Sequence, residues 1–173
     1  MAFFVSTGRK PSMPSRALAK WLARLGGGKS GNRGKSSLDE LVARAEKAGL
    51  TRLVFVYESH GNPSALTFYD AEKGWLDAEF KISSWKIPEK EAEGGKRKRV
   101  PAGVELKVVG DGKQQKKLEE LFGTADENAG VEEENETVEL HFDGEKMWFE
   151  FDGEKIGPEL KGEIRVEEKS GEK

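Results

Sequence analysis

Cysteine is absent from the 173-residue sequence. Disulfide bonds and thiolate metal sites are therefore excluded, and nothing indicates an oxidising compartment. Long hydrophobic runs are absent as well. The apolar start at residues 1–5 gives way to polar and basic residues, far short of the roughly 20 apolar residues that span a membrane. We therefore expect a soluble, cytoplasmic protein with no membrane partner.

Histidine is scarce too, because His60 and His141 are the only two in the chain. Neither has metal-ligand spacing around it, and no local signature indicates a nucleophile with an adjacent base. The glycine-rich segment 26–31 satisfies the G-x-G-x-x-G pattern. That pattern needs a strand before it and a helix after it, whereas here a helix is predicted before it. The sequence therefore predicts no enzyme, no cofactor and no metal site.

Acidic residues are missing from the first 38 positions, although the whole chain has a net charge of -3. From Asp126 onward the balance reverses, and carboxylates outnumber Lys and Arg. A cluster of cations concentrates phosphate whatever the charge of the whole chain. The asymmetry favours a nucleic-acid partner for the N-terminal part, with an ordinary solvated basic surface as the alternative.

The chain is long enough for one ordinary domain, and 35% hydrophobic residues suffice for a core. Its N-terminal half, residues 1–87, predicts a strand at 3–6, helices at 14–25 and 37–49, and strands at 52–57, 65–69 and 75–82. Residues 26–35 between the two helices predict a loop, because glycines are costly inside a helix or strand. Residues 60–63 predict the turn of a hairpin.

The first predicted helix has two different sides. Its apolar residues follow the i, i+3, i+4, i+7 spacing of a buried stripe, at Leu18, Trp21, Leu22 and Leu25. Basic residues recur every fourth position beside that stripe, at Arg16, Lys20 and Arg24. This helix can therefore pack on a core while it presents three cations.

Residues 88–101 are charged and have almost nothing to bury, which predicts a flexible linker. The C-terminal half, residues 102–173, predicts a strand at 105–109, a helix at 113–122 capped by Gly123, and a hairpin of 138–142 with 147–151 around Asp143-Gly144. A last strand is a candidate at 164–166. A helix followed by a hairpin thus occurs twice, at 37–69 and 113–151, within a single domain that spans residues 1–173.

Four segments are unusual together: Ser-Thr-Gly-Arg-Lys-Pro-Ser at 6–12, Arg16, Asn-Arg-Gly-Lys at 32–35 and Glu-Ser-His-Gly-Asn-Pro-Ser at 58–64. This series resembles the N-terminal half of archaeal Brix-domain proteins, and Ile156-Gly157-Pro158 is similar to the Gly-Pro-Arg element of that family's second half. Two residues depart from the family pattern. Gly8 stands where serine is usual, and Glu159 stands where arginine is common, which bears on whether the second half touches RNA.

The resemblance implies an α/β (α+β) fold of two pseudo-repeated halves, each with helices packed on a small mixed sheet, similar to the anticodon-binding domain of class II aminoacyl-tRNA synthetases. It also implies a monomer that binds the ribosomal RNA precursor during subunit assembly and rRNA processing, with ribosomal or assembly proteins as further candidate partners. Lys and Arg would contact phosphate, while Asn and His can read unpaired bases. The candidate RNA-binding residues are Arg9, Lys10, Ser12, Arg16, Lys20, Arg24, Lys29, Asn32, Arg33, Lys35, His60 and Asn62.

Two other functions stay open at this point. The acidic C-terminal half suits a protein-interaction module, and a carboxylate site without a recognised motif suits an RNA-processing enzyme. Salt-sensitive RNA retention separates RNA binding from the first alternative. Metal-dependent RNA cleavage that disappears on mutation of one carboxylate would establish the second. For Asn62-Pro63, turn chemistry is an equal alternative to RNA contact.

Overall fold

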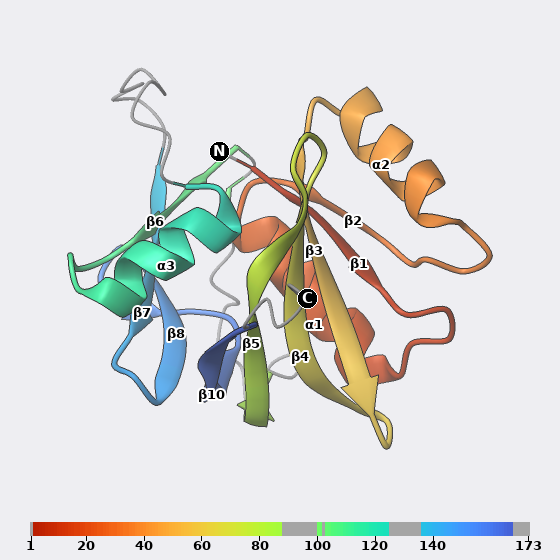
Figure 1. The fold of residues 1–173 in the computed structure, drawn as a ribbon. Helices are drawn as coiled ribbons and strands as arrows, with labels where there is room; N and C mark the ends of the chain where they lie inside the picture. The colour runs from red at the N-terminus through yellow and green to blue at the C-terminus, as the bar shows by residue number, and fades with distance from the viewer. Residues whose placement is uncertain (1, 88–99, 102, 125–135, 168–173) are drawn as a thin grey trace, which may run out of the picture.

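The computed structural model describes residues 2–87, 100–101, 103–124 and 136–167. These residues form three helices and one ten-stranded mixed sheet (Figure 1). The strand order is β2-β1-β3-β4-β5-β10-β8-β7-β6, and β9 pairs with β8. The predicted mixture of helices and strands is confirmed. The expected small sheet in each half is wrong, because β5 pairs with β10 and joins both halves into one sheet.

The elements of the N-terminal half are β1 (Phe4–Thr7), α1 (Met13–Leu25), β2 (Lys29–Gly31), α2 (Leu38–Lys47), β3 (Arg52–Ser59), β4 (Asn62–Asp70) and β5 (Gly74–Lys86). Those of the C-terminal half are β6 (Glu105–Val108), α3 (Lys113–Phe122), β7 (Thr137–Phe142), β8 (Lys146–Phe151), β9 (Glu154–Lys155) and β10 (Glu159–Val166). Strand β1 is parallel to β2 and β3, and β6 is parallel to β7. The other pairs are antiparallel.

All three predicted helices are confirmed, together with their chemical start and stop signals. The Ser37 hydroxyl accepts a hydrogen bond from the Glu40 amide at 3.1 Å, as expected of an N-cap. Helix α3 ends at Gly123, whose φ of 74° lies in the left-handed region that glycine adopts without strain. The termini of these helices were therefore readable from local residue chemistry.

The predicted loop at residues 26–35 is wrong in its middle, because Lys29–Gly31 is strand β2. This strand pairs with Phe4–Ser6 of β1, so backbone hydrogen bonds to a neighbour offset the cost of ordering glycine. Gly28 leads into the strand with its backbone against that of Phe3, where an added Cβ would overlap the Phe3 carbonyl oxygen. Here glycine marks a close backbone approach rather than a loop.

Two other segments differ from the predictions. The turn of the β3–β4 hairpin is His60-Gly61, with φ of 51° and 78°, so Asn62 and Pro63 already belong to β4. Strands β5 and β10 are longer than expected, since they pair with each other from Ala78 to Lys86. Their periodicity alone did not reveal partners that are distant in sequence.

Two hydrophobic cores cover opposite faces of β1 and β3. Val54 and Val56 of β3 point into the larger core, which includes the apolar sides of α1 and α3. Leu53 and Phe55 point into the smaller core under α2. This alternation is the period of two expected of a strand that is buried on both faces.

Helix α3 anchors the C-terminal half to the N-terminal half. The ring of Phe122 lies 5.4 Å from that of Phe3 and 5.0 Å from that of Phe68. Arg52 of β3 donates hydrogen bonds to the carbonyls of Glu120 and Leu121 at the end of α3, where a cation is favourable. Its guanidinium also pairs with Asp70, 3.0 Å away.

Burial alone would raise the pKa of Asp70, but hydrogen bonds from the Glu72 amide, the Arg52 guanidinium and the Lys73 amide lower it.

In the larger core, Val100 is buried, whereas residues 88–99 of the predicted linker lie outside the described residues. Across the described ranges, no helix combines the length and apolar character needed to cross a membrane.

We predict that Arg52→Met lowers the free energy of unfolding by about 2 kcal/mol, because it leaves Asp70 and two helix carbonyls without their charged donor. Urea denaturation followed by circular dichroism measures the change. Arg44→Met is the matched control, since in the described part of the chain the exposed Arg44 guanidinium donates to a side chain only at the Ser36 hydroxyl, and it should cost less than about 0.5 kcal/mol. Equal effects of the two substitutions would contradict the anchoring role of Arg52.

Candidate nucleic-acid interface

Helix α1 carries the central part of the predicted basic surface. The Ser12 hydroxyl accepts a hydrogen bond from the Ser15 amide and caps the helix, and Pro14 lies in the first turn. Leu18, Leu22 and Leu25 are fully buried in the larger core, as the apolar spacing predicted. Trp21 is only half-buried, and its ring lies 5.6 Å from the guanidinium carbon of Arg24.

The three cations of this helix, Arg16, Lys20 and Arg24, are exposed, and we refer to them as the α1 stripe. Because a helix rises about 1.5 Å per residue, the stripe extends roughly 12 Å along α1. Arg16 and Lys20 line a hollow of about 130 Å³ together with Ser30, Gly31 and Asn32 of the neighbouring segment. The structure thus places two of the three stripe residues, Arg16 and Lys20, beside Asn32.

The β3–β4 hairpin contacts the first turn of α1 through a residue that sequence reasoning missed. One carboxylate oxygen of Glu58 accepts hydrogen bonds from the Ser15 hydroxyl at 2.7 Å and the Ser12 amide at 3.1 Å. The hydrogen bond from the Ser15 hydroxyl is the main reason that the pKa of Glu58 is lowered, with further contributions from Ser12 that outweigh burial. In the sequence, the only local signals of this contact are an acidic residue after a predicted strand and a Ser-x-x-Ser series at the start of a predicted helix.

These contacts change the interpretation of two predicted RNA-binding residues. Ser12 serves the helix, because its hydroxyl faces Ser15 and its amide bonds Glu58. Arg33 is half-buried, and its Nε donates to the Ser36 carbonyl at 3.1 Å, which closes the loop before α2. Both residues therefore hold the local backbone in place and project less from the surface than the exposed candidates do.

The remaining candidates are exposed, at several places around α1. Arg9 and Lys10 lie in the turn between β1 and α1, and Lys29 begins β2. Lys35 lies before α2. His60 and Asn62 lie at the tip of the β3–β4 hairpin, where the Asn62 amide donates to the His60 carbonyl at 3.3 Å.

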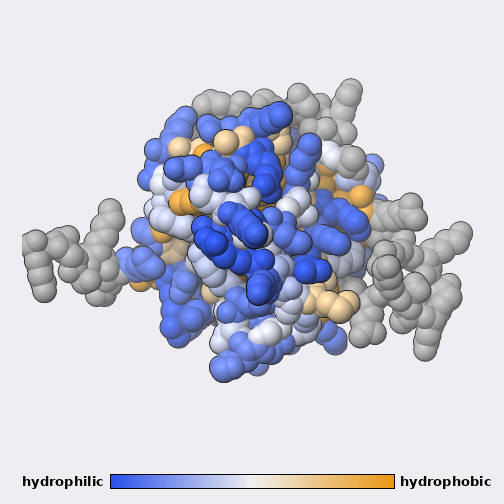
Figure 2. All heavy atoms as spheres, turned by 90° about the vertical axis from the view of Figure 1, so that its right-hand side faces the viewer, coloured by the Kyte–Doolittle hydropathy of each residue, from blue (hydrophilic) through white to orange (hydrophobic). Residues whose placement is uncertain are grey.

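The side of the molecule that bears α2 is predominantly hydrophilic, with only scattered hydrophobic residues (Figure 2). The Asn32 side chain, which lines the hollow beside α1, is held in place because its carboxamide oxygen accepts from the Thr7 hydroxyl at 3.4 Å. The arrangement offers cations for phosphates and fixed amide groups for bases or sugar hydroxyls. Within the described ranges, the one group of three side chains suited to a metal lies elsewhere, at Glu139, His141 and Glu150.

Comparison of the sequence with known proteins finds archaeal relatives. The chain is 35% identical over 108 residues to a probable Brix domain-containing ribosomal biogenesis protein of Methanosarcina barkeri, and the match covers 62% of each chain. A protein of the same description from Methanosarcina mazei is 46% identical over 68 residues, which is 39% of this chain and 41% of the relative. The matches thus span less than two thirds of these relatives. No family model matches the chain.

Comparison of the fold extends the similarity over nearly the whole chain. A probable ribosomal biogenesis protein from Aeropyrum pernix K1 superposes with a TM-score of 0.68 at 22% identity, covering 94% of this chain and 95% of that one. Mil, an archaeal Imp4-like protein, superposes with a TM-score of 0.65 at 25% identity, covering 94% and 99%. The sequence relatives and the shared fold agree with the resemblance of the N-terminal motifs. The chain is thus similar in sequence to archaeal Brix domain-containing ribosomal biogenesis proteins, and similar in fold to an archaeal ribosomal biogenesis protein and an archaeal Imp4-like protein.

Proposed function

We propose that this chain is a non-catalytic, cytoplasmic factor that binds the ribosomal RNA precursor during subunit assembly and rRNA processing, through the α1 stripe and the loops beside it. The observation that carries the proposal is the contrast between paired and unpaired cations. In the part of the chain that the structure describes, no carboxylate forms an ion pair with the α1 stripe. Ion pairs do hold Lys117, Lys146, Lys161 and Arg165 in the C-terminal half.

The unpaired cations favour RNA because phosphate replaces water and counterions rather than a protein carboxylate. The hollow beside Arg16 and Lys20 places Asn32 next to the stripe. An amide at that position can read the edge of an unpaired base or a 2′-hydroxyl. The first turn of α1 is not available to phosphate in the same way, since Glu58 already accepts from the Ser12 amide there.

The C-terminal half supports a different role from that of the stripe. Glu159, where the family often has arginine, lies 3.7 Å from the ammonium group of Lys146. This pair neutralises a cation that would otherwise be free to bind phosphate. We infer that the C-terminal half contributes little to RNA affinity and is the more suitable face for ribosomal or assembly proteins.

The two halves also support an internal pseudo-repeat. In each, a strand and a helix lead to a parallel partner strand, and a further strand then pairs antiparallel to that partner. The order is β1, α1, β2, α2, β3, β4 in the first half and β6, α3, β7, β8 in the second, so the first half has one more strand and one more helix within the unit. We propose on this basis that the chain is a single, monomeric domain of two related units, similar to the anticodon-binding domain of class II aminoacyl-tRNA synthetases.

We predict that Arg16→Gln, Lys20→Gln and Arg24→Gln together weaken RNA binding at least about tenfold and reduce the salt dependence by about 0.7 per lost contact on a single strand. Filter retention of an rRNA fragment at several salt concentrations measures both quantities. Reversal of the same three residues to Glu should weaken binding further. The fold should persist in circular dichroism, because the apolar side of α1 is unchanged.

The matched control is Lys146→Gln, Lys161→Gln and Arg165→Gln, which removes the same charge from the ion-paired cations of the C-terminal half. It should leave RNA affinity within about twofold of the original, since a twofold change is only about 0.4 kcal/mol. Neutralising residues 96–99 is a second control for a basic run outside the described residues. Unchanged binding by the folded α1-stripe variant would refute the proposed interface.

We predict that Glu58→Gln lowers the free energy of unfolding at neutral pH by up to about 1 kcal/mol, because charge-assisted bonds from Ser15 and Ser12 become neutral ones. The folded state lowers the pKa of Glu58. Its contribution is therefore present above the ordinary carboxyl pKa of about 4.3 and lost as the pH falls through the folded-state value. Urea denaturation at pH 7 and pH 3 should show the two proteins converging in acid, whereas the exposed control Glu46→Gln should differ little at either pH.

A further inference from the structure

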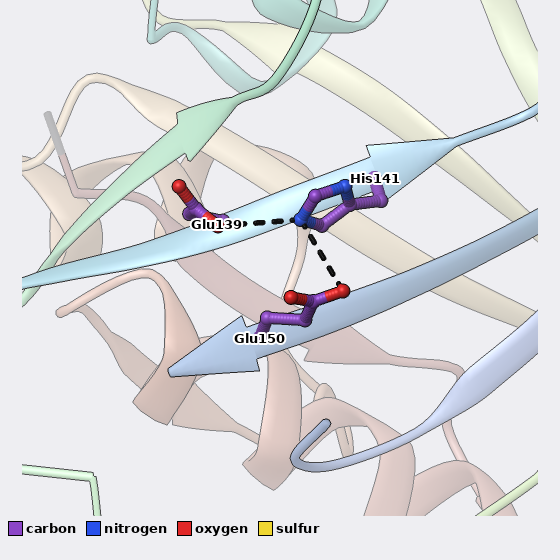
Figure 3. A group of neighbouring side chains, drawn as sticks. All are labelled: Glu139, His141 and Glu150. Carbon is purple, nitrogen blue, oxygen red and sulfur yellow. Dashed lines mark hydrogen bonds and ion pairs between the residues drawn. The ribbon is translucent and has the colours of Figure 1, made fainter. Parts of the chain in front are cut away.

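The outer face of the β7–β8 hairpin gathers a histidine and two carboxylates that the proposed RNA interface does not use (Figure 3). Val138 and Leu140 of β7 point into the larger core, so the alternating residues Glu139 and His141 point away from it. On β8, Glu150 lies directly across from Glu139 in the strand register, and Trp148 lies across from His141. The cluster therefore combines side chains from both strands.

Two carboxylates face each other across this hairpin, a pairing of like charges that destabilises an antiparallel pair of strands. The His141 side chain lies where it can reduce the repulsion between the two carboxylates. Its Nε2 lies 3.3 Å from a carboxylate oxygen of Glu139 and 3.5 Å from one of Glu150, between the two. Two lysines flank the cluster: Lys107 is the register partner of Glu139, and Lys155 that of Glu150.

The distances fit a divalent metal with short bonds to nitrogen and oxygen. Zinc bonds of about 2.0–2.2 Å in a tetrahedron separate neighbouring ligand atoms by roughly 3.3–3.5 Å. Both histidine-to-carboxylate distances have this length, and the three ligand atoms all lie within 4.8 Å of one another. A small movement of one glutamate side chain would close the third edge, and a water molecule would complete the tetrahedron. We propose that Glu139, His141 and Glu150 bind a divalent transition metal of the zinc class.

Trp148 positions two of the three ligands. Its ring stacks on the His141 imidazole, with centroids 5.3 Å apart and planes 6° from parallel. Its indole N–H donates to Glu150 at 2.9 Å, on the same oxygen that faces His141. Such outer contacts hold ligand side chains in their binding orientation. The side chains of His141 and Glu150 are also three-quarters or more buried, with exposures of 22% and 25%, which limits competition from water.

The metal would link the two strands of the hairpin from the face opposite the core. Because the ligands come together only in the folded chain, binding should stabilise the folded state in proportion to metal concentration. The site lies on the C-terminal half, whereas the α1 stripe lies on the N-terminal half. Loss of zinc binding would therefore leave the RNA proposal standing, and loss of RNA binding would leave the metal site standing.

The test is zinc titration of the full chain after treatment with a chelator, followed by calorimetry and by the ring nitrogen signals in NMR. We expect one zinc ion per chain, a large shift of the His141 Nε2 signal and a higher melting temperature. His141→Gln should weaken zinc affinity by about 100-fold or more, since even outer contacts contribute 10- to 100-fold. Trp148→Phe keeps an aromatic ring but removes the indole donor, and should weaken affinity about tenfold.

His60→Gln is the matched control, because it removes the other histidine from the exposed tip of the β3–β4 hairpin. Its zinc affinity and stoichiometry should equal those of the original protein. Absence of zinc binding at micromolar concentration by the original protein would overturn the proposal. Zinc binding that survives in His141→Gln, or that shifts the His60 signal instead, would overturn it as well. Circular dichroism of each variant confirms that the hairpin still folds.

Discussion

Strand β5 hydrogen-bonds to β10 along the segment from Ala78 to Lys86, and this pairing makes the two halves of the chain one sheet. The two strands are separated in sequence by all of β6, α3, β7, β8 and β9, so the pairing closes a long loop. The register of the pair shifts between Lys161 and Gly162, and at Gly162 an added Cβ would overlap the Lys81 carbonyl oxygen. The larger core, the position of α3 and the relation between the two surfaces all depend on this junction.

The junction is reinforced from the core side by apolar contact and by charge. Phe122 packs on Phe3 and Phe68, and Arg52 neutralises the carbonyl end of α3 while it pairs with Asp70. Hydrophobic burial supplies most of the stabilisation, whereas the arginine specifies how α3 is placed, because its planar fork has few alternative partners. One residue of the first half thus fixes a helix of the second.

The same architecture separates the two charged regions of the molecule. The cations of the first 38 residues form no ion pair in the described part of the chain, and that segment contains no carboxylate of its own. Several cations of the C-terminal half form ion pairs with Glu or Asp, as Lys161 does with Glu145 at 3.5 Å. The proposed phosphate-binding surface and the ion-paired surface of the C-terminal half both follow from how the sequence distributes its charges between the halves. The cross-strand cluster around His141 lies within the second, acid-rich half.

The sequence by itself determined the helices, the hairpin turns and the α1 stripe, because helix caps, glycine turns and the 3.6-residue period act over a few neighbouring residues. Ser37, Gly123 and Asp143-Gly144 are examples. Only the tertiary structure decided the pairing of β5 with β10, the short strand β2, the contact of Glu58 with Ser15 and the meeting of Glu150 with His141. Each of these depends on which distant segments become neighbours. Local chemistry specifies where a segment turns and which of its sides is buried. The backbone N–H and C=O groups at the edge of a strand, by contrast, form hydrogen bonds with whichever strand the packing of the whole core brings beside it.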